Sequence, residues 1–135
     1  MNKNIEAIIE KSPSGGLSIY APDIEGVYGY GLNEDEAKAD FREILEEQAE
    51  YFHERKGQYP QWYSDDLSIA YTYDVSGFFE AFPCINASQF AKMLGINQSL
   101  MRKYKSRVAG ASAKQKEILQ QGLNKFVARL QEVRF

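Results

Sequence analysis

Hydrophobic and polar residues alternate along two short stretches near the start of the chain, residues 4–11 and 17–21. A period of two is typical of a β-strand with one buried face. Residues 12–16, which lie between them, consist only of Ser, Pro and Gly and therefore predict a tight turn. We expect a hairpin here, followed by a third strand over residues 27–31.

A helical pattern follows. Apolar residues recur every three or four positions between Ala37 and Phe52, and Asn33 with Glu36 forms a capping-box signature ahead of them. Acidic residues dominate the first turn and basic residues the last turn, the order that the helix dipole favours. The pattern predicts one long helix over residues 34–55.

Residues 67–74 alternate again and predict a fourth strand. The first domain, expected over residues 1–74, is then β-β-β-α-β, a small sheet with one helix across a face. Residues 74–83 are rich in Phe and predict a short helix that begins a second domain. That domain, residues 75–135, is expected to be all-α, so the predicted fold class is α+β.

Two short helices joined by a tight turn are predicted within residues 86–105. Asn86 and Asn97 are placed to cap them, and Gly95 can take the positive φ that such a turn needs. The second helix collects its apolar residues on one face, around Met101. This pattern is typical of a helix-turn-helix, whose second helix enters the major groove of DNA. The candidate DNA-binding residues are the polar ones at its start and on its outward face: Asn97, Gln98, Ser99, Arg102, Lys103 and Lys105.

Charge is divided unevenly along the chain. Residues 1–74 contain 6 basic and 16 acidic residues, a net charge of −10, whereas residues 75–135 contain 10 and 3, a net charge of +7. Between Glu80 and Glu117 there are seven basic residues and no acidic one. A basic block on a helix-turn-helix pattern favours a polyanionic partner for the second domain. The alternatives are a helical hairpin within a core and a solvated basic face.

A final helix is predicted from Ser112 onward. Its apolar residues are spaced by four, three, four and three: Leu119, Leu123, Phe126, Leu130 and Val133. Because this spacing resembles a coiled-coil seam, we expect a homodimer or higher oligomer, formed through this helix or through a sheet edge. Two recognition helices of a dimer would meet DNA half-sites about 34 Å apart.

The sequence lacks the residues that several classes of functional site require. The single cysteine, Cys84, excludes an intramolecular disulfide, and the single histidine, His53, excludes a histidine metal cluster. No stretch approaches the roughly 18 consecutive apolar residues of a membrane span, and the start has no signal-peptide core. We therefore expect a cytoplasmic protein with no catalytic residue, metal or cofactor. Cys84 is expected to be buried and His53 to be exposed.

Several features of the first domain occur together: the Gly15-Gly16 hairpin, the loop Pro22-Asp23-Ile24-Glu25-Gly26, a glycine-rich strand and a capped helix rich in Glu and Ala. In the second domain, residues 96–104 read Ile-Asn-Gln-Ser-Leu-Met-Arg-Lys-Tyr. Together these features resemble the HicB antitoxins, over nearly the whole chain. The family pattern also implies a glycine soon after the recognition helix, where this chain has Arg107.

The resemblance implies an antitoxin of a type II toxin-antitoxin system. In HicB proteins a degenerate ribonuclease H-like domain binds and blocks HicA, a small RNA-cleaving toxin. A C-terminal DNA-binding module, in one version a helix-turn-helix, represses the operon. We accordingly expect residues 1–74 to sequester a HicA-like toxin and residues 75–135 to bind operator DNA.

Two other functions stay open. One is a transcriptional repressor whose N-terminal domain senses a small ligand. The other is a residual metal nuclease, for which the first domain offers only scattered carboxylates: Glu6, Glu10, Asp23 and Glu25.

Two side-chain groups of the first domain have alternative interpretations. The acidic face of the long helix is either a solvated face or a contact for a basic toxin; it comprises Glu43, Glu46, Glu47, Glu50 and Glu54. The aromatic cluster is either a loop that packs on its own domain or a toxin contact; it comprises Tyr59, Trp62 and Tyr63.

Overall fold

The computed structural model describes residues 3–135 and shows a mixed α+β protein with a four-stranded sheet and five helices. The chain divides into two compact units, Met1–Pro83 and Cys84–Phe135. The sheet lies in the first unit, and the second unit is helical. The order of strands and helices expected from the hydrophobic pattern is confirmed.

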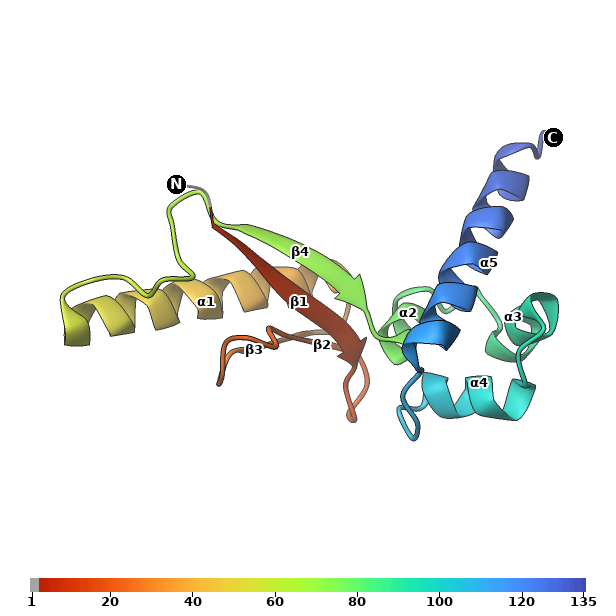
Figure 1. The fold of residues 1–135 in the computed structure, drawn as a ribbon, viewed down its shortest axis with the longest axis horizontal. Coiled ribbons are helices and arrows are strands. Elements are labelled where there is room, and N and C mark those ends of the chain that lie inside the picture. The colour runs from red at the N-terminus through yellow and green to blue at the C-terminus, as the bar shows by residue number, and fades with distance from the viewer. Residues whose placement is uncertain (1–2) are drawn as a thin grey trace. The chain divides into compact units, whose positions relative to one another are not determined.

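Four strands form the sheet: β1 (Asn4–Lys11), β2 (Leu17–Tyr20), β3 (Tyr28–Gly31) and β4 (Ser68–Tyr73). Their spatial order is β3-β2-β1-β4 (Figure 1). β1 and β2 form the expected antiparallel hairpin, and β3 continues antiparallel beside β2. β4 pairs in parallel with β1, with Ile69 opposite Ile5. The two edges of the sheet are therefore β3 and β4.

Helix α1 (Glu34–Lys56) covers one face of the sheet and lies over β3 and β2. It approaches β3 closely because Gly29 and Gly31 have no side chains. A Cβ added at Gly29 would lie 2.5 Å from the Cβ of Phe41, and one at Gly31 would lie 2.3 Å from the backbone nitrogen of Ala37. Phe41 and Ala37 are fully buried. Glycine weakens an isolated strand, but in β3 it makes room for the helix.

Helix α2 (Val75–Ala81) packs on the end of β1 and belongs to the first unit. The Lys11 N–H donates to Ser76 Oγ at 3.1 Å, and a Cβ at Gly77 would lie 2.2 Å from the Ile9 carbonyl oxygen. The first unit thus extends to Pro83, beyond the end expected at residue 74. The boundary was expected too early because α2 packs on β1 through Ser76 and Gly77, whose contacts are with residues distant in the sequence.

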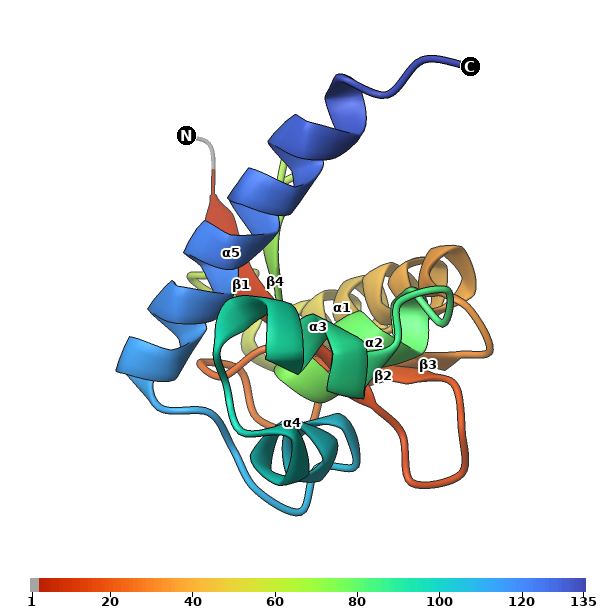
Figure 2. The ribbon, with the colours of Figure 1, turned by 90° about the vertical axis from the view of Figure 1, so that its right-hand side faces the viewer.

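The second unit contains α3 (Ala87–Leu94), α4 (Gln98–Lys105) and α5 (Ala113–Gln131) (Figure 2). The side chains of Asn86 and Asn97 cap α3 and α4, and each accepts a backbone N–H at 2.9 Å. Gly95, between the two helices, has a φ of 74°, a left-handed conformation that glycine adopts readily. The caps and the turn predicted within residues 86–105 are confirmed.

Helix α4 ends at a left-handed residue that is not glycine. Arg107 follows the C-cap Ser106 and has a φ of 65°. Its N–H donates to the Tyr104 carbonyl at 3.1 Å, and the Val108 N–H donates to the Lys103 carbonyl at 2.9 Å. These are the two hydrogen bonds of a Schellman motif, in which glycine usually takes the left-handed position. Arginine takes that position here, at a cost of about 1 kcal/mol in backbone strain.

Replacing Gly29 by alanine should destabilise the first unit more than the same change at Gly15. A Cβ at Gly29 overlaps Phe41, so α1 must move, at a cost of about 3 kcal/mol. Gly15 has a φ of 89° and open space around it, so Gly15→Ala costs only about 1 kcal/mol of backbone strain. The fluorescence of Trp62, the single tryptophan, reports unfolding of this core. Equal losses in the two variants would contradict the close packing of α1 on β3.

Arg107→Gly should leave the second unit about 1 kcal/mol more stable than Arg107→Ala. Both substitutions remove the arginine side chain, but only glycine relieves the left-handed strain. Denaturant unfolding followed by the helical circular dichroism signal measures the difference. An alanine variant as stable as the glycine variant would rule out the left-handed cap.

Candidate functional site

The outward face of α4 gathers most of the residues predicted to contact DNA. Met101 and Tyr104 are buried, with exposed fractions of 0% and 4%. Five of the predicted residues are exposed and form what is called the α4 surface below: Gln98, Ser99, Arg102, Lys103 and Lys105. The sixth, Asn97, is also exposed, but its side-chain oxygen caps α4 by accepting the Leu100 N–H.

Arg102 is held in place by two serine hydroxyls. Its Nη1 donates to Ser88 Oγ and its Nη2 to Ser99 Oγ, both at 3.1 Å. Because Ser88 lies on α3, these bonds connect the two helices. A guanidinium has five N–H donors, so the bonds orient Arg102 and leave donors for a ligand. Sequence reasoning missed Ser88, because a serine within a helix carries no spacing signal.

An apolar cluster fixes α4 relative to α3. Phe90, Ala91 and Ile96 are buried together with the inward face of α4. The Ile96 N–H donates to the Ala91 carbonyl at 2.9 Å and closes the turn. Ala91 is fully buried, and its small side chain lets the helices approach. The α4 surface therefore lies on a rigid two-helix support, which is the kind of scaffold that a precise contact surface needs.

The second unit carries a strong positive charge. Residues 84–135 contain 10 basic residues and 2 acidic ones, a net charge of +8. Both acidic residues, Glu117 and Glu132, come after the start of α5. Residues 84–116 therefore contain seven basic residues and no acidic one. This balance creates a positive potential around the α4 surface that attracts polyanions.

The first unit carries the opposite charge, with 6 basic and 17 acidic residues and a net charge of −11 over residues 1–83. Five carboxylates line an open depression along α1, called the α1 acidic face below: Glu43, Glu46, Glu47, Glu50 and Glu54. Glu46 lies 3.9 Å from Arg42, and Glu50 accepts a hydrogen bond from the Tyr59 hydroxyl at 2.8 Å. That hydrogen bond raises the pKa of Tyr59. All five carboxylate residues are exposed to solvent.

An aromatic loop packs beside the end of α1. Trp62 and Tyr63 lie against the core, as expected for a loop that packs on its own domain, whereas Tyr59 is 42% exposed. His53 is half-buried rather than exposed, because its ring stacks on Tyr59 with centroids 4.3 Å apart. A groove of about 420 Å³ lies here, with Phe52, Arg55 and Trp62 among its lining residues.

Cys84 is exposed, so the expectation that it would be buried is wrong. It directly follows Pro83, at the junction of the two units, rather than lying within a helix or strand. Among residues 3–135, no three His, Cys, Asp or Glu side chains gather closely enough to hold a metal ion. Over the same residues, no helix combines the length and the apolar character needed to cross a bilayer.

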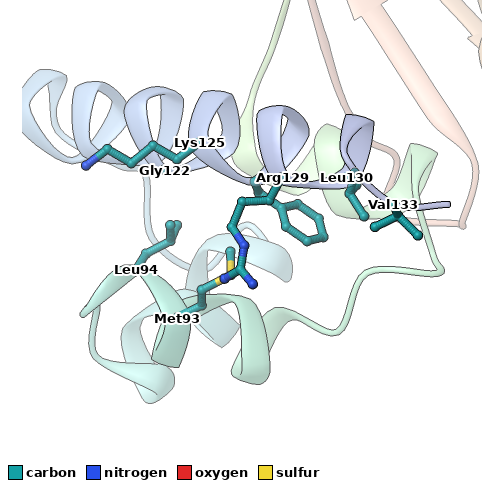
Figure 3. Close-up of a pocket in the computed structure, with 8 residues that line it drawn as sticks. Met93, Leu94, Gly122, Lys125, Arg129, Leu130 and Val133 are labelled. Atoms are coloured by element: carbon teal, nitrogen blue, oxygen red, sulfur yellow. The ribbon is translucent and has the colours of Figure 1, made fainter.

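An apolar groove of about 440 Å³ runs between α3 and α5 (Figure 3). Leu94 packs closely on α5, since a Cβ added at Gly122 would lie 2.0 Å from its Cδ2 atom. Leu119, Leu123 and Phe126 are half-buried, whereas Leu130 near the end of α5 and Val133 just beyond it are 52% and 49% exposed. The heptad-like face is thus partly covered in its first half and open in its second half.

No protein-family model matches the sequence, and no curated protein matches it.

Proposed function

We propose that this protein is an antitoxin and autoregulator, whose second unit binds operator DNA and whose first unit blocks an RNA-cleaving toxin of the HicA type. The observation that carries the proposal is the division of charge between two compact units, −11 over residues 1–83 and +8 over residues 84–135. Surfaces of opposite charge fit partners of opposite charge, a nucleic acid and a basic RNA-binding protein. The protein acts by occlusion and performs no chemistry.

In this proposal α3 and α4 form a helix-turn-helix, and α4 is the recognition helix. Gln98 and Ser99 stand at the start of α4, the part of a recognition helix that contacts base edges. A glutamine amide suits adenine, and the oriented guanidinium of Arg102 suits guanine or a phosphate. Lys103 and Lys105 are assigned to phosphates. The protein binds as a dimer or higher oligomer, with two α4 helices on half-sites about 34 Å apart.

The α1 acidic face supports the toxin-binding part of the proposal. Like charges spaced by three or four residues destabilise a helix, and a basic partner relieves that repulsion. A protein that cleaves RNA needs a basic surface for its polyanionic substrate. If the α1 acidic face covers that surface, RNA can no longer reach it.

A repressor that senses a small ligand is the second candidate. The observation that favours it is the groove beside the aromatic loop. Its walls include Phe52 and Trp62, and the basic Arg55 and Lys56 outnumber the single carboxylate, Glu25. Apolar walls with a few charged groups are typical of sites for small organic anions.

Replacing Lys103 and Lys105 by alanine should weaken binding to the DNA upstream of the protein's own gene and flatten its salt dependence. Each lost phosphate contact lowers the slope of log K against log salt by about 0.9, so the double variant should lose about 2. Fluorescence anisotropy over a salt series measures both effects. The matched control, Lys114→Ala with Lys116→Ala, removes the same charge at the start of α5 and should keep most of the slope. Equal effects of the two pairs would mean that net charge alone determines binding.

Replacing Glu47 and Glu54 by lysine should abolish toxin neutralisation. These residues lie seven positions apart on the α1 acidic face and are exposed, so the change reverses its charge without disturbing the core. Bacterial growth measures neutralisation when the full chain is co-expressed with the product of the gene adjacent to its own. The control, Glu6→Lys with Asp65→Lys, makes the same charge change at other exposed positions. Full rescue by the Glu47/Glu54 variant would exclude this face, and no rescue by the folded wild type would favour the ligand-sensing candidate.

A further inference from the structure

The two edges of the sheet are protected to different degrees. At β3, two backbone N–H groups donate to carboxylates of α1: Tyr30 to Asp40 Oδ2 at 2.8 Å, and Leu32 to Glu36 Oε2 at 3.0 Å. Side chains that satisfy edge groups and a helix that covers them keep a further strand from pairing. The β3 edge is therefore protected at Tyr30 and Leu32.

At β4 the protection is limited to its start, where Arg42 of α1 donates to the Leu67 carbonyl at 3.0 Å, and among residues 3–135 no side chain bonds to the backbone groups of Ile69, Tyr71 or Tyr73. The Asp74 N–H donates to the Ile9 carbonyl of β1 at 2.9 Å, so the even-numbered residues of β4 form the bonds to β1. Because backbone groups alternate in direction along a strand, Ile69, Tyr71 and Tyr73 direct their N–H and C=O groups away from the sheet. Helix α1 packs mainly on β3 and β2, and its side chains reach β4 at the rings of Tyr71 and Tyr73 and at the Leu67 carbonyl rather than at these outward groups.

The composition of β4 also permits pairing. Its sequence, Ser-Ile-Ala-Tyr-Thr-Tyr, contains no charge, proline or glycine, and four of its six residues are exposed. Natural edge strands usually carry lysine, proline or a bulge that discourages another strand. β-branched and aromatic residues favour pairing. The β4 edge can therefore form backbone hydrogen bonds with one more strand.

We infer that β4 pairs antiparallel with β4 of a second copy of this chain, which joins two four-stranded sheets into one. Centring the pair on Tyr71 places Tyr71 opposite its own copy and Ile69 opposite Tyr73. In this register the outward N–H and C=O groups of each facing pair bond to each other, as an antiparallel ladder requires. The faces that carry α1 then form one continuous face of the joined sheet, so neither α1 helix stands between the two paired strands.

Charges of α1 near the two ends of β4 complement each other in this arrangement, whereas the Lys38 side chains, each 4.5 Å from its own Tyr71 ring centroid, lie near its centre. Glu34 accepts a hydrogen bond from the Tyr73 hydroxyl at one end of β4, and Arg42 donates to the Leu67 carbonyl at 3.0 Å near the other end. Antiparallel pairing therefore brings Glu34 of one copy toward Arg42 of the other, twice about the symmetry axis. Burial opposes ionisation of Glu34, but hydrogen bonds from Lys38 and Tyr73 lower its pKa, so it is charged at neutral pH. The side chains of Glu34 and Arg42 are 27% and 44% exposed.

A second copy fits this edge better than a strand from a basic partner protein. β4 has no acidic residue to attract such a strand, whereas its own sequence and the Glu34–Arg42 arrangement are self-complementary. The open half of α5 is the other surface on which copies could meet. This inference does not rest on the proposed function, because pairing through β4 requires neither DNA nor toxin.

The test uses full-length chains that carry Glu34→Arg or Arg42→Glu, followed by sedimentation velocity. Each single variant should dimerise about tenfold more weakly than the wild type, because like charges meet at both ends of the pair. An equimolar mixture should recover dimers as a heterodimer. At one end of that heterodimer the two substituted side chains meet with opposite charges, and at the other end the native Glu34 and Arg42 meet. Circular dichroism confirms that each variant is folded.

The matched control is Glu54→Arg, which makes the same charge change on α1 away from β4 and should leave dimerisation unchanged. A wild type that is monomeric, or a mixture no more dimeric than the separate variants, would overturn the inference. So would dimers that persist in both variants and disappear with Leu130→Glu, since this result would assign the contact to α5. If the chain sediments as a monomer alone and forms a complex only with another protein, that protein supplies the pairing strand. This result would also overturn the inference.

Discussion

The packing of α1 on the glycines of β3 determines which surfaces of the first unit are covered and which are free. Because Gly29 and Gly31 have no side chains, the helix lies directly over β3, and its carboxylates Asp40 and Glu36 reach the N–H groups at that edge. The β3 edge is thereby protected, whereas the outward backbone groups of Ile69, Tyr71 and Tyr73 in β4 have no such partner among residues 3–135. The same placement turns the α1 acidic face outward. Both partner surfaces inferred for this unit follow from this one contact.

The second unit depends on a small buried cluster, and its caps and turns set the position of α4. Three basic residues, Arg102, Lys103 and Lys105, lie in the last turn of α4, where the helix dipole favours cations. The charge needed to bind a polyanion therefore stabilises the helix that carries it. Two serines orient Arg102, and the left-handed Arg107 ends the helix. Such fixed geometry suits a surface that must match a partner of regular shape.

The sequence predicted the features that depend on neighbouring residues. The strand period, the capping asparagines and the turn at Gly95 are local, and the structure confirms them. The parallel placement of β4 and the seating of α2 on β1 depend on contacts between distant segments, which periodicity does not reveal. The family pattern implies a glycine near Arg107, but the arginine itself gives no sign that it will adopt the left-handed conformation. On the α4 surface, the exposed residues were predictable from helical spacing, whereas the bond from Arg102 to Ser88 on another helix was not.

We propose that the basic second unit reads a specific DNA sequence. The affinity of the full-length wild type for the duplex upstream of its own gene, compared with a scrambled duplex of equal length and composition, tests this proposal. At physiological salt, binding to the upstream duplex should be tighter by about 10³-fold or more, the usual margin of a specific DNA-binding protein. Equal affinity for the two duplexes, or no binding to either, would contradict it.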